Sequence, residues 1–327
     1  MNVLVAIYSP VAAWNIPDRH VERLRREFPY HSFRHARRED EVMPLIGDTD
    51  IAFTSELRRA QFAAARRLRW VHSPAAGVGA MLFPEMVDSP VVMSNSRAMS
   101  AGHIAEHVIL VTLALFRKLP LAFRSQLRKY WAQDDAVAAP PMRTIRGSRA
   151  LLVGLGSIGA ACASRFAALG ATVDAVRRRI DQPRPDGVTD VGTADQLLPF
   201  LGRADVVIIT AAQTAETRGI IGETQLTAMK SDAILVNVSR GKLVDEAKLA
   251  HALSAGSIGG AALDVFEHEP LDAASPLWTL PNVIVTPHTS GFRADHWDAA
   301  TDLFAQNLRR FDSRQPLLNL VDKAAGY

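Results

Sequence analysis

Short apolar runs alternate with amphipathic segments along the first hundred residues. Runs of four to eight mostly apolar residues, rich in β-branched side chains, indicate strands, whereas apolar positions repeating every three to four residues indicate helices. The strands predicted in this way cover residues 2–8, 50–55, 69–73 and 91–96, and the helices cover 17–28 and 56–68. Such alternation predicts parallel sheets joined by right-handed helical crossovers.

Over residues 99–119 the apolar positions repeat with the spacing of a long helix, which we interpret as a connection between two domains. Residues 132–147 contain a Pro pair and a Gly, and they are predicted to form a loop. A second strand–helix alternation follows, and a helix is predicted near the end of the chain. Its strands are predicted at residues 149–154, 171–176, 205–210, 233–238, 259–266 and 282–287, and the last helix at 294–311. At 327 residues the chain is long enough for two domains.

Composition excludes several classes of protein. The chain is 48% hydrophobic and 22% charged, with a net charge of only +3, and its arginines are dispersed, so solvated helix faces are favoured over a nucleic-acid groove. Cys162 is the single cysteine, which excludes an intrachain disulfide and fits a reducing compartment such as the cytoplasm. The first ten residues resemble a strand rather than a signal peptide, and the run "VILVTLALF" is too short to span a bilayer.

A glycine-rich motif follows the strand predicted at 149–154. Gly154, Gly156 and Gly159 form G-x-G-x-x-G, and the motif opens a helix, which is the context that makes it informative. These glycines allow a tight turn, close approach of a pyrophosphate, and close packing of helix on strand. The first helical residues, Ser157 and Ile158, then offer unpaired N–H groups to the phosphates. The alternative is a glycine-rich turn without a ligand.

Three arginines end the next strand, "ATVDAVRRR". In the nucleotide-binding pattern an acidic residue stands about 20 residues beyond the glycine loop and bonds the ribose of NAD, but here Arg177, Arg178 and Arg179 occupy that place. A guanidinium can clamp a 2′-phosphate, which a carboxylate repels. We therefore predict NADP(H) as the preferred cofactor, with NAD(H) possible, and Arg178 as the first choice for the clamp. The alternative is a solvated basic turn.

Polar residues follow three later strands. Arg240 comes after residues 233–238, Glu269 after 259–266 and His288 after 282–287. Ligands of open parallel sheets bind at the carboxyl ends of strands, so these side chains are expected to converge near a bound nicotinamide. A protonated imidazole can give its proton to the oxygen of a ketone that receives hydride, a carboxylate can orient that imidazole, and a guanidinium can hold an α-keto acid.

As a set, several motifs resemble the D-isomer-specific 2-hydroxyacid dehydrogenases, a family that includes glyoxylate/hydroxypyruvate reductases and phosphoglycerate dehydrogenases. The motifs are "VGLGSIG", "NVSRGKLVDE", "ALDVFEHEPL", "LPNVIVTPH" and "PLLNLVD". The resemblance implies that Arg240, Glu269 and His288 are catalytic, and that the backbone N–H groups of Ala76 and Gly77 hold the substrate carboxylate.

The resemblance also implies further cofactor contacts from Thr217, Val238, Asp264 and His288, and no metal. The implied fold is α/β with two doubly wound parallel-sheet domains. A flavodoxin-like substrate domain would comprise residues 1–98 and 289–327, and a Rossmann domain would be inserted at 99–288. The site would lie in the cleft between the domains. The expected partners are a small 2-keto or 2-hydroxy acid and a second copy of the chain in a homodimer, with neither nucleic acid nor membrane.

Two departures and two rival functions accompany this interpretation. "AAQTAET" replaces a proline-containing turn of the family, and "AAGVG" lacks an aspartate that often follows. The segment "HIAEH", His103 to His107, matches a zinc-protease pattern and would place two histidines on one helix face. The second rival is a non-enzymatic nucleotide-binding protein, because corepressors of the C-terminal-binding protein type share this fold.

Overall fold

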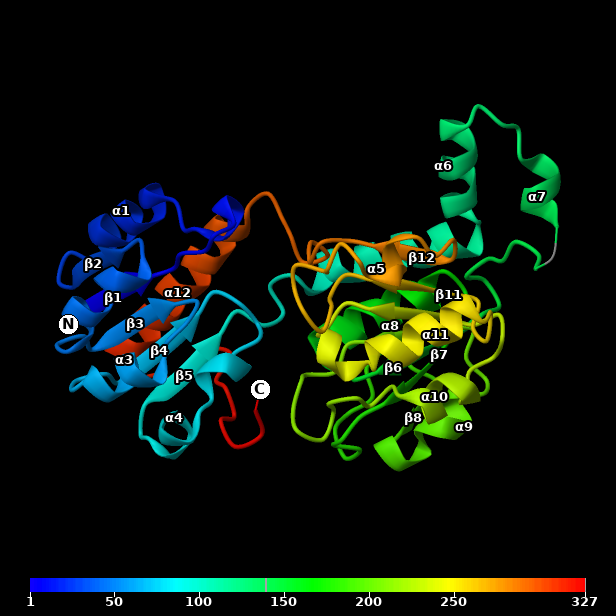
Figure 1. Ribbon diagram of the computed structural model, residues 1–327. Coiled ribbons are helices and arrows are strands. Elements are labelled where there is room, and N and C mark those ends of the chain that lie inside the picture. Colours follow the sequence, from blue (N-terminus) through cyan, green and yellow to red (C-terminus); the bar gives the residue numbers. More distant parts are fainter. Residues whose placement is uncertain (139, 327) are drawn as a thin grey trace. The chain divides into compact units, whose positions relative to one another are not determined.

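The computed structural model describes residues 1–138 and 140–326, which divide into two compact units (Figure 1). The first unit comprises Met1–Met99 and Arg293–Tyr327, and the second comprises Ser100–Phe292. The sequence places these divisions at 98/99 and 288/289. The second unit is thus one continuous insertion into the first.

The first unit contains a five-stranded parallel sheet in the order β2-β1-β3-β4-β5. This is the flavodoxin-like order. The strands are β1 (Asn2–Ala6), β2 (Ser32–Ala36), β3 (Ile51–Thr54), β4 (Trp70–Ser73) and β5 (Val92–Asn95). We did not predict β2, because its sequence "SFRHA" lacks an apolar run and only two of its residues are buried. Its pairing along the full length of β1 makes it a strand despite that composition.

Helices cover both faces of this sheet. They are α1 (Asp18–Glu27), α2 (Met43–Ile46), α3 (Arg59–Ala64), α4 (Pro84–Asp88) and α12 (His296–Asp312), with 3-10 turns η1 (Ala12–Trp14), η2 (Glu39–Glu41) and η3 (Gly79–Met81). The ring of Phe304 on α12 stacks on Phe53 and Trp70, with centroids 4.4 and 5.3 Å apart. The C-terminal helix therefore completes the core of the unit that the N-terminal strands begin.

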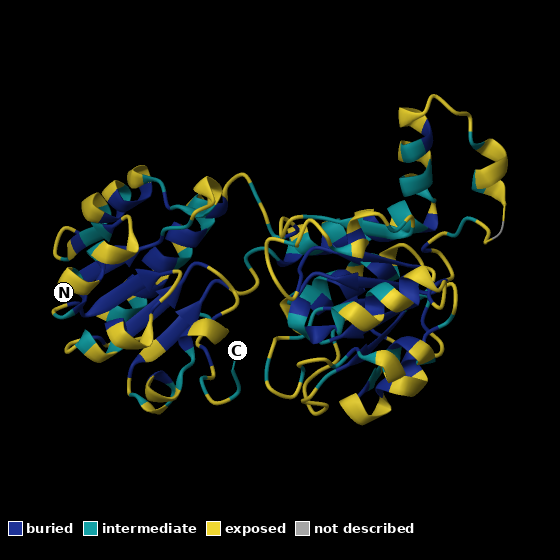
Figure 2. Ribbon diagram, in the orientation of Figure 1, coloured by how far each residue is buried: buried dark blue, intermediate teal, exposed yellow. Residues whose placement is uncertain are grey.

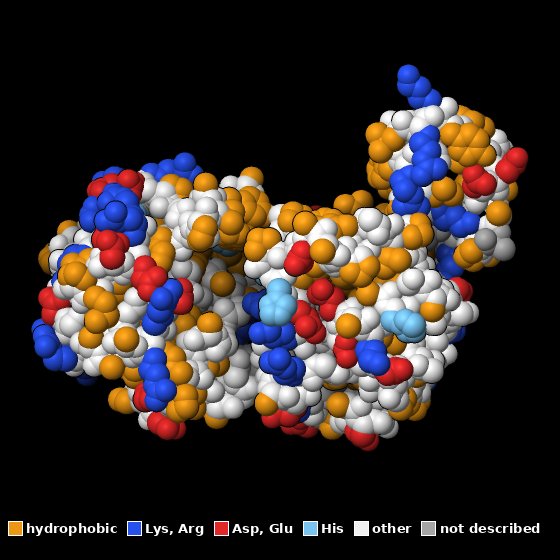
Figure 3. All heavy atoms as spheres, viewed as in Figure 1, with side chains coloured by type: hydrophobic (Ala, Val, Ile, Leu, Met, Phe, Trp, Pro, Cys, Tyr) orange, Lys and Arg blue, Asp and Glu red, His pale blue; other side chains and the backbone are white. Residues whose placement is uncertain are grey.

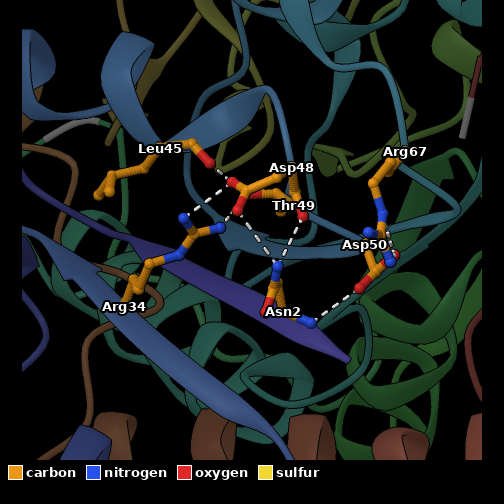
Figure 4. A network of polar contacts seen from close by, with 7 residues as sticks. All are labelled: Asn2, Arg34, Leu45, Asp48, Thr49, Asp50 and Arg67. Atoms are coloured by element: carbon orange, nitrogen blue, oxygen red, sulfur yellow. Dashed lines mark hydrogen bonds and ion pairs between the residues drawn. The ribbon is translucent and has the colours of Figure 1, made fainter.

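A polar network links the start of β1 to the segment before β3 (Figure 4). The backbone N–H of Asn2 donates to Asp50 Oδ2 over 2.8 Å, and Arg67 donates to Asp50 Oδ1 over 3.0 Å. Arg34 on β2 pairs with Asp48 at 2.8 Å. The predicted helix at 56–68 ends early, at Ala64, and Arg67 lies beyond it in the segment that leads to β4.

The second unit contains a seven-stranded parallel sheet in the order β12-β11-β10-β9-β6-β7-β8. The strands are β6 (Arg149–Val153), β7 (Thr172–Val176), β8 (Asp190–Gly192), β9 (Val206–Ile209), β10 (Ile234–Asn237), β11 (Gly260–Leu263) and β12 (Val283–Val285). Read from β8, this is the Rossmann strand order extended by one strand, and it reverses between β6 and β9. The predicted fold class is confirmed.

The central strands of both sheets are deeply buried, whereas the edge strands β2, β8 and β12 are less so (Figure 2). In the second unit two apolar clusters pack on opposite faces of the sheet. The helices are α5 (Ala101–Phe116), α6 (Leu119–Leu127), α7 (Gln133–Val137), α8 (Ser157–Ala168), α9 (Leu197–Leu201), α10 (Glu223–Ala228) and α11 (Glu246–Ser254), with 3-10 turns η4 (Ala194–Gln196), η5 (Gly241–Leu243) and η6 (Pro276–Trp278).

The helix predicted at 99–119 is two helices in the structure. α5 ends at Phe116, Lys118 adopts a left-handed conformation with φ 54°, and α6 starts at Leu119. The predicted loop at 132–147 contains the short helix α7, and its residue 139 lies outside the described residues. α6 and α7 stand away from the rest of the unit (Figure 1), and we call residues 119–137 the α6–α7 arm.

Over the described part of the chain, no helix has both the length and the apolar character needed to cross a bilayer.

Candidate active site

The glycine loop joins β6 to α8 at the point where the strand order reverses. A Cβ on Gly154 would lie 2.4 Å from the backbone nitrogen of Ala211, and the residue has a φ of +103°. A Cβ on Gly159 would lie 2.6 Å from the carbonyl oxygen of Gly154, whereas one on Gly156 would meet nothing within 4 Å. The first and third glycines are therefore required by packing, and the second faces open space.

The start of α8 fits a phosphate group. Gly156 is the N-cap and supplies no side-chain hydrogen bond, so the first-turn N–H groups of Ser157, Ile158 and Gly159 keep their capacity to bind an anion. Thr210, which follows β9, donates from Oγ1 to the carbonyl oxygen of Gly154 over 2.7 Å. Sequence reasoning missed Thr210; its position at the strand end beside the reversal point was the available signal.

The carboxylate of Asp174 on β7 is held in two ion pairs within the protein. Its side chain is 1% exposed and pairs with Arg149 at 2.8 Å and with Arg203 at 3.0 Å. No acidic side chain occupies residues 177–179, so the carboxylate that usually bonds the ribose of NAD is missing from this strand end.

The arginines after β7 differ in what they contact. The guanidinium of Arg177 donates to the carbonyl oxygens of Gln182 and Pro183, the latter over 3.2 Å, and thereby closes the turn that follows the strand. Arg178 and Arg179 are exposed. A hydrogen bond from Thr214 is the main cause that lowers the pKa of Glu216, and the charge of Arg178 adds to it.

Thr217 and Val238 lie after β9 and β10 respectively. The hydroxyl of Thr217 donates to the carbonyl oxygen of Ala212 over 2.8 Å and accepts from the N–H of Thr214 over 2.7 Å. It thereby folds the "AAQTAET" loop on itself. Val238 is 6% exposed. The cofactor contacts assigned to both residues stay predictions.

Three side chains converge after β10, β11 and β12. The imidazole of His288 donates from Nδ1 to Glu269 Oε2 over 2.7 Å. Glu269 Oε1 accepts from the backbone N–H of Phe266 over 3.0 Å, which fixes the carboxylate. Arg240, Glu269 and His288 line one pocket of the second unit, together with Gln213, Lys242 and Glu267.

Burial and charge set the ionisation of these groups. Burial lowers the pKa of Arg240 from its ordinary value, against the opposing effect of the Glu269 charge. Burial raises the pKa of Glu269, but the hydrogen bonds from His288 and Phe266 and the charges of His288 and Arg240 outweigh it, so the net pKa is lowered. Glu269 is therefore a carboxylate at neutral pH, and it faces a cation and an imidazole.

Gly241 brings the loop of Arg240 against the loop of Glu269. A Cβ there would lie 1.8 Å from the carbonyl carbon of Phe266, so only glycine fits. Asn237 at the end of β10 donates from Nδ2 to the carbonyl oxygen of Arg240 over 3.0 Å. Neither residue was singled out from the sequence, although both belong to the motif "NVSRG" that contains Arg240.

Asp264 follows β11 and is 1% exposed. Its carboxylate accepts from Thr286, Thr289 and Ser290, which flank His288 on both sides. The structure therefore commits the carboxylate of Asp264 to protein donors. The cofactor contact assigned to Asp264 stays a prediction.

The two residues predicted to hold the substrate carboxylate belong to the first unit. Ala76 and Gly77 are exposed in the loop after β4. Asn95 at the end of β5 donates from Nδ2 to the carbonyl oxygen of Ala76 over 2.7 Å. Because a trans peptide is planar, this bond also directs the N–H of Gly77 away from Asn95. Sequence reasoning missed this role of Asn95.

The residues of "HIAEH" lie on α5 and do different things. His103 is exposed, Glu106 pairs with Arg165 at 3.6 Å, and His107 Nε2 lies 3.4 Å from the hydroxyl of Thr286. In residues 1–138 and 140–326, no three His, Cys, Asp or Glu side chains are grouped as metal ligands would be.

Comparison with known proteins agrees with the geometry. Residues 109–290 match the family model described as D-isomer specific 2-hydroxyacid dehydrogenase, NAD binding domain. The chain is 31% identical to a glyoxylate reductase of Korarchaeum cryptofilum, over 94% of each chain. It is 31% identical to a D-3-phosphoglycerate dehydrogenase of Archaeoglobus fulgidus over 79% of this chain, and there it spans only about half of the relative, 48%.

Solved structures show the same architecture. The chain superposes with a TM-score of 0.83 on a D-isomer specific 2-hydroxyacid dehydrogenase from Xanthobacter autotrophicus in complex with NADPH and MES. The two are 30% identical, and the superposition covers 99% of each chain. Fold, glycine loop and strand-end side chains thus define an NAD(P)-binding oxidoreductase. The chain belongs to the D-isomer specific 2-hydroxyacid dehydrogenase family, which confirms the family predicted from the motifs.

Proposed function

We propose that the protein reduces a small 2-keto acid to the D-2-hydroxy acid with NADPH, and that glyoxylate and hydroxypyruvate are its substrate class. The observation that carries this proposal is the 2.7 Å hydrogen bond between His288 Nδ1 and Glu269 Oε2, in a pocket that Arg240 also lines. Glyoxylate is the substrate in the name of the relative from Korarchaeum cryptofilum, which matches this chain over nearly its full length.

A bound nicotinamide would supply hydride to the keto carbon, which would leave negative charge on the keto oxygen for the side chains to neutralise. His288, whose Nδ1 is bound to Glu269, donates a proton from Nε2 to that oxygen. The carboxylate of Glu269 fixes the orientation of the ring. In the oxidative direction the same imidazole takes the proton back.

Arg240 is the residue that holds the keto acid. Its guanidinium can contact the carboxylate and the carbonyl of one substrate together. The N–H groups of Ala76 and Gly77 are the proposed partners of the other side of the substrate carboxylate, and Asn95 orients the peptide between them through the carbonyl oxygen of Ala76.

The cofactor's phosphates would be held by the glycine loop and the first turn of α8, where no side chain caps the helix. NADP(H) is the proposed preference, because Arg177 to Arg179 replace the usual acidic residue and Asp174 is occupied by two arginines. The guanidinium of Arg177 is bonded within its own turn. Arg178 therefore remains our first choice for binding the 2′-phosphate.

We further propose a homodimer through the α6–α7 arm. Phe123, Leu127 and Trp131 are 59%, 86% and 85% exposed, and hydrophobic side chains gather over the arm (Figure 3). α6 carries the basic Arg124, whereas α7 carries Asp134 and Asp135. Opposite charges on α6 and α7 suit a two-fold contact, in which α6 of one copy packs against α7 of the other. Sedimentation of Leu127→Asp should show monomers if the arm is the contact, and an unchanged mass would place the contact elsewhere.

A panel of keto acids with NADPH and NADH tests the function. We expect oxidation of NADPH with glyoxylate or hydroxypyruvate and a higher kcat/KM than with NADH. Tight nicotinamide binding with no turnover on any keto acid would favour the non-enzymatic, corepressor-type alternative.

A further inference from the structure

The buried carboxylate of Asp264 accepts hydrogen bonds from residues on both sides of His288 in the chain. Asp264 Oδ1 accepts from the Thr286 hydroxyl over 2.6 Å and from the N–H of Thr289 over 2.9 Å, and Oδ2 accepts from the N–H of Ser290 over 2.9 Å. All three donors belong to the segment that contains His288. The side chain is 1% exposed, so a ligand has almost no surface of Asp264 to touch.

His288 needs such support because its backbone is strained. It has a φ of 53°, in the left-handed region that a side chain with a Cβ rarely adopts. Its N–H donates to the backbone oxygens of Asp264 over 2.9 Å and of Thr286 over 3.0 Å. The backbone oxygen of Asp264 thus binds His288, and its carboxylate binds Thr289 and Ser290.

A third residue supports this arrangement from α5. The hydroxyl of Thr286 has one proton, which it gives to Asp264, so it can only accept from His107 Nε2 at 3.4 Å. Burial lowers the pKa of His107, against the opposing charge of Asp264, so the ring is neutral with its proton on Nε2. This contact accounts for His107 of the "HIAEH" motif.

We propose that Asp264, supported by Thr286 and His107, is a positioning residue that keeps His288 in the left-handed conformation from which its ring reaches Glu269. This inference rests on the proposed function, in which His288 is the acid. It gives the carboxylate of Asp264 a role at the histidine turn, beside the cofactor contact predicted for this residue.

Thr286→Val tests the inference most cleanly, because it removes the hydroxyl and keeps the shape. We expect kcat with glyoxylate to fall on the order of 10-fold or more, since small displacements of a catalytic group are costly. The dissociation constant of NADPH, measured by fluorescence titration, should stay within about 2-fold, since the change reaches no cofactor contact. Thr286→Ser, which restores the hydroxyl, should recover most of the lost turnover.

A matched control is Thr279→Val, which removes an exposed hydroxyl bonded to the carbonyl oxygen of Pro276 over 3.1 Å elsewhere in the same unit. Its kcat should equal that of the unmodified protein. Thermal melting of each variant identifies any loss that comes from unfolding alone.

Asp264→Asn separates the two roles of the carboxylate. As a positioning residue, Asp264 should affect kcat far more than NADPH binding. NADPH binding weakened 10-fold or more with kcat retained would overturn the proposal, as would wild-type kcat in Thr286→Val.

A crystal structure of Thr286→Val decides the matter without turnover. We expect a changed φ at His288 and loss of the His288–Glu269 hydrogen bond, whereas an unchanged turn would refute the positioning role. If the unmodified protein reduces no keto acid, the proposed function fails, and the crystal structure still tests the positioning.

Discussion

The imidazole of His288 lies 2.7 Å from the carboxylate of Glu269, although the two residues are 19 positions apart in the chain. Each residue follows a different strand of the sheet in the second unit, β12 and β11 respectively, and these strands are neighbours. The pairing leaves one ring nitrogen, Nε2, for chemistry and dedicates the other to orientation.

Replacing the proposed acid, His288, should remove turnover and leave cofactor binding unchanged. We expect His288→Asn to lose on the order of 100-fold or more in kcat, with NADPH still bound. Glu269→Gln should also lower kcat, because a neutral amide holds the imidazole ring less firmly than the carboxylate does. Steady-state rates and fluorescence titration of NADPH measure these effects. Near-normal turnover in His288→Asn would remove His288 from the mechanism.

Arg240→Lys keeps a positive charge and loses the planar fork. We expect both a higher KM for glyoxylate and a lower kcat, because a lysine cannot hold carboxylate and carbonyl in one plane. Kinetics with several keto acids provide the measurement. Wild-type constants on all of them would show that a point charge suffices.

Replacing the arginines after β7 should change the preference between NADPH and NADH. Replacing Arg177 with Asp and Arg178 with Ala supplies the missing ribose acceptor and removes the phosphate clamp. Charge-assisted hydrogen bonds contribute roughly 1.5–3 kcal/mol each, so the preference for NADPH should disappear or reverse. The ratio of kcat/KM for the two cofactors is the readout. Equal efficiency with both in the unmodified protein would show that the arginines do not recognise the phosphate.

A buried histidine in the first unit should make the fold sensitive to acid. His72 is fully buried, and burial lowers its pKa from 6.5 to about 3. Ser96 Oγ donates to the carbonyl oxygen of Ser73 and therefore accepts from His72 Nε2 at 3.4 Å. The other ring nitrogen, Nδ1, then accepts from Ser94 Oγ over 2.7 Å, so the ring is neutral.

Below pH 6.5 the unfolded chain therefore binds a proton at His72 that the folded chain excludes. The stabilising effect is fully present above 6.5 and is lost as pH falls toward 3, by up to about 1.4 kcal/mol per pH unit. Urea unfolding between pH 7.5 and 5 should show a shallower loss of stability in His72→Asn. Parallel losses in both proteins would contradict the assignment.

Much of the architecture could be predicted, because it depends on patterns close together in the chain. The apolar strands and the glycine loop indicated the fold, and strand-end positions indicated Arg240, Glu269 and His288. β2 and β8 were missed because "SFRHA" and the three residues of β8 have no apolar run. Their strand character depends on neighbours in the sheet, β1 and β7.

The environment of single side chains could not be predicted in the same way. Asp264 meets donors 22 to 26 residues further along the chain, and only the folded sheet brings them together. The sequence likewise gave no sign that Arg177 would turn onto the carbonyl oxygens of its own loop. Nor did it show that Asn95 would fix the carbonyl oxygen of Ala76, since the two lie at the ends of adjacent strands.

The most direct measurement is the product formed from hydroxypyruvate with NADPH, resolved by chiral chromatography, for the unmodified protein and for His288→Asn. The unmodified protein should convert hydroxypyruvate to D-glycerate, with one NADPH oxidised for each molecule formed, and His288→Asn should bind NADPH but form almost none. L-glycerate, no product despite bound NADPH, or equal rates in the two proteins would contradict the account.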